Sequence, residues 1–238
     1  MSDALRLSRL ANGQPEIFVS IQGEGVSAGV PSVFVRLALC NLQCSWCDTR
    51  YTWDWQQYDA KTETIGLRVP EVIRRIQESG MRNVVITGGE PLLQQVGLVG
   101  LASALKAGGQ RIEVETNGTR LPRPDLAEHV DQWNVSPKLA NSGNDPGRRE
   151  APATLLWFAQ QTNAYFKFVV VEPGDIGEVD ALVARYGVPA VRVLLMPEGR
   201  DADALAGRAA WLVNECCKRG YRFTPRLHVL LWGDERGR

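Results

Sequence analysis

The sequence predicts an α/β protein built as a partial (β/α) barrel of about six parallel strands. Short runs rich in β-branched residues alternate along the chain with longer amphipathic runs, and this alternation is typical of parallel sheets made from βαβ units. A complete barrel needs eight such units, and the chain offers fewer. The length of 238 residues suits one domain of this kind, and no change in composition marks a linker.

The predicted elements follow one another in the order that βαβ units require. In the first helix, Val69, Val72 and Ile76 recur at helical spacing and share one face. The predicted strands span residues 32–38, 83–87, 111–115, 132–136, 165–171 and 190–195. The predicted helices span residues 69–79, 91–107, 151–161, 175–186 and 201–219. The segments 39–68 and 139–150 are irregular, and the second is expected to be a surface loop.

Charge and apolar composition argue against several classes of protein. The 27 Lys and Arg residues balance the 27 Asp and Glu residues, so no bulk field recruits nucleic acid or a membrane surface. No run approaches the roughly 18 apolar residues of a transmembrane helix, and the first residues lack the apolar stretch of a signal peptide. We therefore expect a soluble, cytoplasmic protein that binds neither nucleic acid nor membranes.

Three of the five cysteines lie close together, directly after the first predicted strand. In the segment CNLQCSWCDT, Cys40, Cys44 and Cys47 form a C-x3-C-x2-C array. Thiolates favour soft metals, and a cluster of them in a cytosolic protein indicates a metal rather than disulfides. A structural zinc site usually has four ligands, but the two histidines, His129 and His228, lie far along the chain. Three thiolates on a four-iron cluster would leave one iron open, whereas zinc binding and simple burial of the cysteines remain as alternatives.

Four loops with unusual sequences directly follow predicted strands. They are GGEP at 88–91, TNGT at 116–119, SPK at 136–138 and MPEG at 196–199. Ligands of such folds bind at the carboxyl ends of the parallel strands, so we expect these loops and the cysteine array to surround one site. Gly88 and Gly89 would let the backbone approach a ligand closely, and Glu90 could accept from a ligand ammonium. Ser136 and Lys138 offer further polar contacts.

The cysteine array together with GGEP resembles the signature of the radical S-adenosylmethionine superfamily. The resemblance implies one domain of this type over residues 1–238, with a [4Fe–4S] cluster held by Cys40, Cys44 and Cys47. In that superfamily S-adenosylmethionine chelates the open iron, and one electron from the cluster cleaves it to a 5′-deoxyadenosyl radical. The segments GGEP, ETNG and SPK resemble those that contact this cofactor. The implied cofactor-binding residues are Trp46, Asp48, Gly89, Glu90, Glu115, Asn117, Ser136, Pro137 and Lys138.

A narrower resemblance covers nearly the whole chain. It rests on the segments EIFVSIQGEG, FVRLALCNLQCSWCDT, TGGEP, ETNG, SPK and RLHVLLWGDERGR, which are similar to those of the 7-carboxy-7-deazaguanine synthase family. That family, a group of carbon–nitrogen lyases, converts 6-carboxy-5,6,7,8-tetrahydropterin to 7-carboxy-7-deazaguanine with loss of ammonia, on the path to queuosine. The resemblance further implies a homodimer, dependence on Mg²⁺ and a flavodoxin-like reductant protein.

The same resemblance implies a substrate site and a magnesium ligand. Arg36 lies on a predicted buried strand, where a guanidinium needs an anion; the substrate carboxylate would supply one, and a protein carboxylate is the alternative. Thr49 matches the position whose hydroxyl binds Mg²⁺, an ion that prefers oxygen ligands. His228 matches a substrate-contacting histidine, and a structural role is its alternative. The implied substrate-binding residues are Ser20, Gln22, Glu24, Arg36, Thr87 and His228.

Three other functions stay open at this point. A glycyl-radical activating enzyme would share the cysteine array and a similar size, but it would act on a large protein partner and have no pterin site. An iron–sulfur electron carrier would need neither GGEP nor S-adenosylmethionine. A zinc-stabilised binding module would hold one metal ion in place of a cluster.

Overall fold

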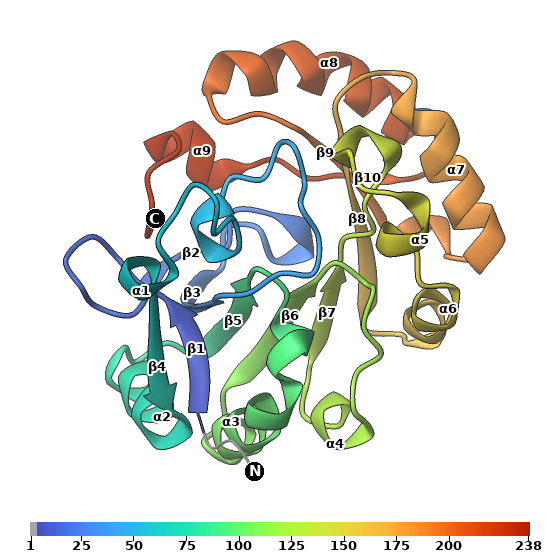
Figure 1. The fold of residues 1–238 in the computed structure, drawn as a ribbon. Coiled ribbons are helices and arrows are strands. Elements are labelled where there is room, and N and C mark those ends of the chain that lie inside the picture. Colours follow the sequence, from blue (N-terminus) through green and yellow to red (C-terminus); the bar gives the residue numbers. More distant parts are fainter. Residues whose placement is uncertain (1–3) are drawn as a thin grey trace.

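The computed structural model describes residues 4–238 and shows a ten-stranded sheet (Figure 1). The strand order is β10-β9-β8-β7-β6-β5-β3-β1-β4, and β2 pairs with β3 beside this path. The strands are β1 (Ala4–Ser8), β2 (Ile17–Ile21), β3 (Pro31–Leu37), β4 (Thr64–Arg68), β5 (Asn83–Gly88), β6 (Arg111–Thr116), β7 (Gln132–Val135), β8 (Ala164–Val170), β9 (Val193–Pro197) and β10 (Arg222–Phe223). This mostly parallel sheet confirms the predicted α/β class and partial barrel.

The parallel part of the sheet consists of β3 and the strands from β5 to β10. The six predicted strands are all present, and the short β10 extends them. The strand predicted at 190–195 begins later, at Val193, because the carbonyl of Pro189 accepts from Arg192 N at 2.8 Å and closes a turn first. The helix predicted at 91–107 divides into a 3₁₀ turn (Pro91–Gln94) and α3 (Gln95–Ala107).

Three strands that the sequence did not reveal form an antiparallel end of the sheet. β1 pairs with β3 and β4, and β2 pairs with β3. β1 is only five residues long, and it alternates exposed positions with the fully buried Leu5 and Leu7. β2 matters for the site because the QGEG segment follows it directly and reaches the interior of the sheet, where Gln22 Nε2 donates to Glu115 Oε1 at 3.1 Å and Glu24 pairs with Lys167.

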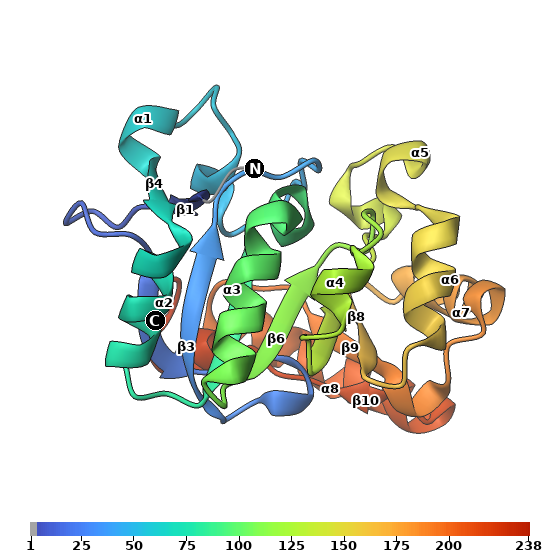
Figure 2. The same ribbon diagram turned by 90° about the horizontal axis from the view of Figure 1, so that it is seen from below.

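Helices cover the outer face of the curved sheet (Figures 1 and 2). They are α2 (Val69–Glu78), α3, α4 (Pro124–Ala127), α6 (Pro152–Gln160), α7 (Asp175–Tyr186) and α8 (Ala202–Arg219), with α1 (Ala60–Glu63), α5 (Pro146–Arg149) and α9 (Leu227–Trp232) in the connecting and terminal segments. The apolar core fills the space between helices and sheet. The side chains of β5, β6 and β7 on the opposite face of the sheet include several buried polar ones: Asn83, Thr87, Glu113, Gln132 and Asn134.

None of the helices within residues 4–238 has both the length and the apolar character that crossing a membrane would need.

The segment 139–150 is only in part the surface loop that its polarity predicted, because residues 145–148 are exposed but several other positions are buried. It forms a 3₁₀ turn (Ala140–Ser142) and α5, and Ser142 and Asn144 are buried. Short polar side chains satisfy its backbone locally, as where Ser142 Oγ donates to Leu139 O at 2.7 Å. The prediction was wrong for Ser142 and Asn144, because these polar residues make hydrogen bonds inside the protein instead of with water.

Candidate active site

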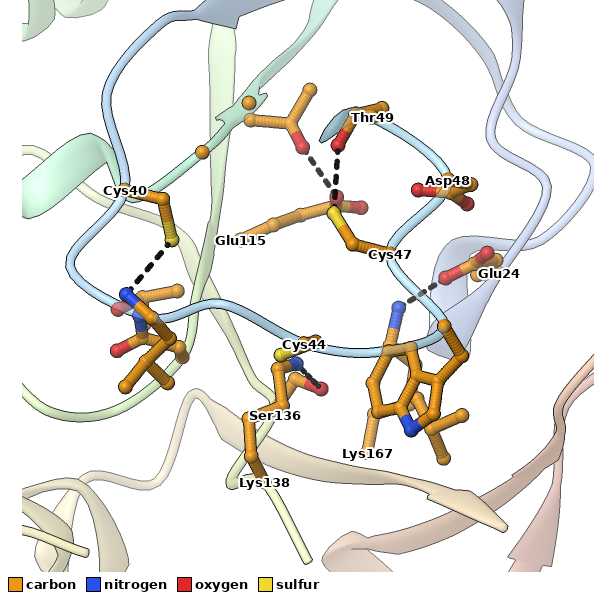
Figure 3. A pocket seen from close by; sticks show the side chains of 18 of the residues that line it. Glu24, Cys40, Cys44, Cys47, Asp48, Thr49, Glu115, Ser136, Lys138 and Lys167 are labelled. Atoms are coloured by element: carbon orange, nitrogen blue, oxygen red, sulfur yellow. Dashed lines mark hydrogen bonds and ion pairs between the residues drawn. The ribbon is translucent and has the colours of Figure 1, made fainter. Parts of the chain in front are cut away.

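Two adjoining cavities open at the carboxyl ends of the parallel strands. The first, of about 160 Å³, is lined by the three cysteines of the array (Figure 3), and the second, of about 170 Å³, is lined by Arg36 and His228. The residues that line both are Glu24, Asp48, Thr49, Thr87, Gly88, Glu115 and Arg226. The four strand-end loops and the cysteine loop all contribute to the first cavity, so the predicted convergence on one site is confirmed.

Each cysteine sulfur of the array accepts one hydrogen bond from an N–H group. The pairs are Leu42 N to Cys40 Sγ at 3.5 Å, Asn144 Nδ2 to Cys44 Sγ at 3.4 Å, and Trp53 Nε1 to Cys47 Sγ at 3.3 Å. Hydrogen bonds of this kind stabilise the negative charge of metal-bound thiolates. The donors thus suit sulfurs that serve as ligands.

The sulfurs suit a cluster better than a single metal ion. Burial raises the pKa of the Cys40 thiol to about 12 and also raises the pKa of Cys44, so these thiols ionise only where a metal supplies positive charge. Within residues 4–238, no three His, Cys, Asp or Glu side chains are grouped closely enough for one ion. Three thiolates spread around a cavity fit an iron–sulfur cluster and do not fit the zinc alternative.

A strained turn at the start of the cysteine loop explains the two glycines of GGEP. Leu39 has a left-handed backbone with φ of 76°, which is uncommon for a residue other than glycine, and Glu90 N donates to its carbonyl at 2.8 Å. A side chain at Gly88 would overlap the carbonyl of Leu37, and one at Gly89 would overlap that of Leu39. Neighbouring backbone therefore requires both glycines, in addition to any ligand in the cavity.

The segment 139–150 supports the cysteine loop from the opposite side. Ser45 N donates to Ser142 O at 2.9 Å, and Asn144 Oδ1 accepts from Gln43 N at 2.9 Å. Trp46 Nε1 donates to Asn141 Oδ1 at 3.1 Å. These contacts fix the loop that carries the three cysteines without occupying the cavity.

A buried group of charges forms the wall between the two cavities. Glu24 forms ion pairs with Lys167 and, at 3.0 Å, with Arg226 Nε, and His228 Nε2 lies 3.9 Å from Glu24 Oε1. Arg226 also pairs with Asp48 and donates to Gly199 O at 2.7 Å. It therefore ties the QGEG segment, the cysteine loop and the loop after β9 together.

The electrostatic balance of this group keeps Glu24 ionised and His228 neutral. Burial opposes the charge of Glu24, but the charges of Lys167 and Arg226 outweigh it and lower the pKa of the carboxyl. Burial lowers the pKa of His228, and the opposing attraction of Glu24 does not offset it. A neutral imidazole at this wall has one donor and one acceptor for a ligand.

These buried carboxylates predict a stability that falls in acid. Burial also opposes the charge of Glu16, but Arg36 and Arg236 outweigh it and lower the pKa of this carboxyl, as Lys167 and Arg226 do for Glu24. Because both folded-state pKa values lie below the unfolded value, the stabilisation is complete above the unfolded pKa and is lost as the pH falls through the folded ones. We expect the melting temperature to decline once the pH drops below about 4.5. The slope should be shallower in Glu24→Gln; equal slopes in both proteins would contradict the assignment.

Arg36 is held by a protein carboxylate on one side and faces the second cavity on the other. Its Nε donates to Glu16 Oε1 at 2.7 Å, which is the contact that the alternative interpretation predicted. The buried Glu16 also accepts from Tyr51 Oη at 3.2 Å and Arg236 Nε at 3.1 Å. Among residues 4–238, the two Nη atoms of Arg36 have no hydrogen-bond partner, so their N–H groups remain for a ligand.

The other predicted residues divide between cavity walls and supporting positions. Glu115 lines both cavities and accepts from Thr87 Oγ1 at 2.7 Å and from Gln22 Nε2 at 3.1 Å. Lys138 Nζ donates to Ser136 Oγ at 2.8 Å and lies 5.5 Å from the ring centroid of Trp46. Gly89, Asn117, Ser136 and Lys138 line the first cavity, as predicted.

Three predicted site residues do not line either cavity. Ser20 lies opposite Ser32 in the β2–β3 ladder, nearer the amino ends of the parallel strands. Glu90 is fully buried, and its carboxylate accepts from Leu92 N at 2.9 Å, Thr116 Oγ1 at 2.8 Å and Asn117 N at 2.7 Å. Pro137 is likewise absent from both walls. Glu90 therefore orients the loop after β6 in this structure instead of facing a ligand.

Several residues of the site were not predicted from the sequence. Lys167 and Arg226 line the first cavity, yet each stands alone in an apolar or mixed segment with no motif around it. Lys167 in the otherwise apolar strand β8 was the available signal, because a cation in a buried strand needs an anion. Trp53 and Asn144 lie in the two irregular segments, where no period predicts which side chain points inward.

Known proteins that are similar to this chain show the class of enzyme to which it belongs. The Radical SAM superfamily profile matches residues 35–138, which include the cysteine array, GGEP, ETNG and SPK. The crystal structure of QueE from Escherichia coli superposes with a TM-score of 0.71 at 26% identity and covers 95% of this chain and 96% of that one. A partial barrel with this loop at the carboxyl ends of its strands is a radical S-adenosylmethionine enzyme, and the class implies a [4Fe–4S] cluster and S-adenosylmethionine.

Close relatives then define the family. The 7-carboxy-7-deazaguanine synthase of Pyrobaculum aerophilum is 44% identical over 227 residues, covering 94% of this chain and 96% of that protein. The one from Halobacterium salinarum is 39% identical over 243 residues, covering 92% and 90%. The chain belongs to the 7-carboxy-7-deazaguanine synthase family, as its sequence predicted. The activating-enzyme and electron-carrier alternatives are not favoured.

Proposed function

We propose that this chain converts 6-carboxy-5,6,7,8-tetrahydropterin to 7-carboxy-7-deazaguanine with loss of ammonia, in one domain that works in the cytoplasm. The observation that carries the proposal is the shared wall between two cavities. One cavity has three thiolates for a cluster, and the other has the free guanidinium face of Arg36 for a carboxylate. Ligands in the two cavities would meet at Glu24, Thr87 and Glu115. The cluster and S-adenosylmethionine supply the one-electron chemistry when bound, and the protein binds, orients and shields.

The first cavity offers groups for each part of S-adenosylmethionine. Cys40, Cys44 and Cys47 would hold the cluster. Lys138 and Ser136 supply donors for the ligand carboxylate or ribose, and Trp46 presents an aromatic ring for adenine. Asp48, Gly89, Glu115 and Asn117 complete the wall. Glu90 acts in this proposal by holding the backbone of Asn117 in place.

The second cavity matches a carboxylated pterin. Arg36 offers paired Nη donors, the geometry that binds a carboxylate best. Gln22, Glu24 and Thr87 offer both donors and acceptors to the edge of the pterin ring, and neutral His228 adds one of each. A substrate that leaves a donor or acceptor of this wall unpaired would bind much more weakly.

Thr49 lines both cavities and is our proposed protein ligand for Mg²⁺. Magnesium is commonly bound by few protein oxygens, with substrate and water completing its shell. We expect Thr49→Ala to lower turnover by roughly 10–100-fold, the usual cost of disturbing a metal site, and to weaken the dependence on Mg²⁺. Thr49→Ser keeps the hydroxyl and should retain most of both. The measurement is initial rate against Mg²⁺ concentration, and an unchanged Mg²⁺ curve in Thr49→Ala would rule out the ligand role.

Two partners complete the proposal. A flavodoxin-like reductant protein would deliver the electron, and a second copy of the chain would form a homodimer. Both are proposed from the resemblance to the family. Sedimentation of the loaded protein tests the dimer, and turnover with reduced flavodoxin in place of a chemical reductant tests the donor.

Turnover of the loaded protein tests the reaction itself. The protein is reconstituted anaerobically with iron and sulfide and mixed with reductant, S-adenosylmethionine, Mg²⁺ and the carboxypterin. We expect 7-carboxy-7-deazaguanine and ammonia to form in equal amounts. Chromatography and mass spectrometry measure the deazaguanine product. Formation of 5′-deoxyadenosine without deazaguanine would refute the substrate and leave the enzyme class intact.

A further inference from the structure

We propose that two side chains, the indole of Trp53 and the amide of Asn144, set the reduction potential of the cluster. This inference rests on the proposed function, because it presupposes a cluster on the three cysteines. The main chain supplies the donor to the Cys40 sulfur, but side chains supply those to Cys44 and Cys47. The potential is therefore open to adjustment by substitution at two of the three ligands.

Trp53 is aimed at the Cys47 sulfur by a tight turn. The 3₁₀ turn Arg50–Thr52 follows the cysteine loop directly, and Trp53 N donates to Arg50 O at 3.0 Å at its end. The indole lines the first cavity, and its Nε1 lies 3.3 Å from Cys47 Sγ. An indole N–H can only donate, and the sulfur is its hydrogen-bond partner among residues 4–238.

Asn144 combines a supporting contact with a donor to sulfur. Its Oδ1 accepts from Gln43 N at 2.9 Å, which fixes the amide plane against the cysteine loop. Its Nδ2 then lies 3.4 Å from Cys44 Sγ and also donates to Ser142 Oγ at 3.2 Å. Asn144 is buried, so water does not compete for this contact. The amide dipole consequently points its positive end at the ligand sulfur.

Donors at the sulfurs favour the reduced cluster. The reduced form carries one more negative charge, part of which lies on the thiolates, and N–H dipoles stabilise that form more than the oxidised one. Removal of a donor should therefore lower the midpoint potential and make reduction harder. A purely structural role for Trp53 would change cluster yield or protein stability but would leave the potential of loaded protein unchanged.

The test is a redox titration of the cluster-loaded protein without S-adenosylmethionine. The electron paramagnetic resonance signal of the reduced cluster is measured at each potential. Trp53→Phe keeps the ring and removes the N–H, and Trp55→Phe, at a residue 39% exposed and away from both cavities, is the matched control. At a fixed potential we expect the ratio of reduced to oxidised cluster in Trp53→Phe to fall on the order of tenfold, or about 59 mV for one electron. Trp55→Phe should match the wild type.

Asn144→Asp provides a second variant. It keeps the oxygen that accepts from Gln43 N, removes the amide donor and adds negative charge, so its potential should fall further than that of Trp53→Phe. If a variant does not load its cluster, electron spin echo spectroscopy of the wild type with ¹⁵N-labelled tryptophan tests the same hydrogen bond. We expect a coupling between an indole nitrogen and the cluster.

Two outcomes would overturn the inference about the reduction potential, and a third would overturn the proposed function as well. Unchanged potentials in loaded Trp53→Phe and Asn144→Asp would refute it, and so would the absence of nitrogen coupling in the wild type. A wild-type protein that forms no cluster would refute the proposed function itself.

Discussion

Cys44→Ala is expected to contain no [4Fe–4S] cluster and to have no turnover, a loss on the order of 10⁶-fold or more. The protein offers three thiolates around the first cavity, and no other cysteine lines it. With one removed, two ligands remain for a cluster that already needs an outside ligand for one iron. Iron and sulfide content, visible absorbance and turnover after anaerobic reconstitution measure the effect.

The control for this prediction is a cysteine elsewhere in the same chain. Cys217 is exposed on α8, whereas Cys44 is 7% exposed beside the cavity. Cys217→Ala should load a full cluster and keep wild-type turnover, which shows that the handling of thiols in the assay is not responsible. Cys44→Ala that retains four irons and four sulfides would mean that the array is not the ligand set.

Arg226→Met is expected to lose both stability and activity. Arg226 neutralises Glu24 and Asp48 and donates to Gly199 O, so its removal leaves buried carboxylates without one partner. Breaking a buried ion pair from one side costs about 3–5 kcal/mol. The same carboxylates line both cavities, so repulsion between them should displace the cysteine loop relative to QGEG. Urea unfolding of the unloaded protein measures the first effect, and kcat/KM of the loaded enzyme measures the second.

Two further variants separate the charge of Arg226 from its geometry. Arg226→Lys keeps the charge but cannot hold two carboxylates and a carbonyl at once, so it should lie between wild type and Arg226→Met. Arg222→Met, at an exposed arginine four positions earlier on β10, should change stability by less than about 0.5 kcal/mol. An Arg226→Met protein as stable and active as Arg222→Met would contradict the role of the buried charge group.

The parallel strands and their helices could be predicted because their signals are local. An apolar run such as the one in NVVIT can only be a buried strand or a segment of a buried helix. The glycines of GGEP directly after it limit the run to the length of a strand. β1, β2 and β4 could not be found in the same way. They are short, partly exposed and antiparallel, and they become strands by pairing with β3 and with each other, which is a contact distant in the sequence.

The site shows the same division between local and distant information. The three cysteines, the two glycines of GGEP, Thr49 and Arg36 stand in motifs or on strands, and each was predicted at the site and lines a cavity. Arg226 and Lys167 act through Glu24, which precedes them by more than a hundred residues. Their charges alone could not tell a surface position from a buried one. The segment 139–150 was misplaced because polarity indicates hydrogen bonding but not whether water or protein supplies the partner.

The proposed reaction depends above all on Cys40, Cys44 and Cys47 holding a cluster with one iron open to S-adenosylmethionine. The most direct test is electron paramagnetic resonance of the reduced, loaded protein before and after addition of S-adenosylmethionine. We expect a [4Fe–4S] signal whose g values change when S-adenosylmethionine is added, because the cofactor becomes a ligand of the cluster. A signal that S-adenosylmethionine leaves unchanged, from protein with a full complement of iron and sulfide, would contradict the claim.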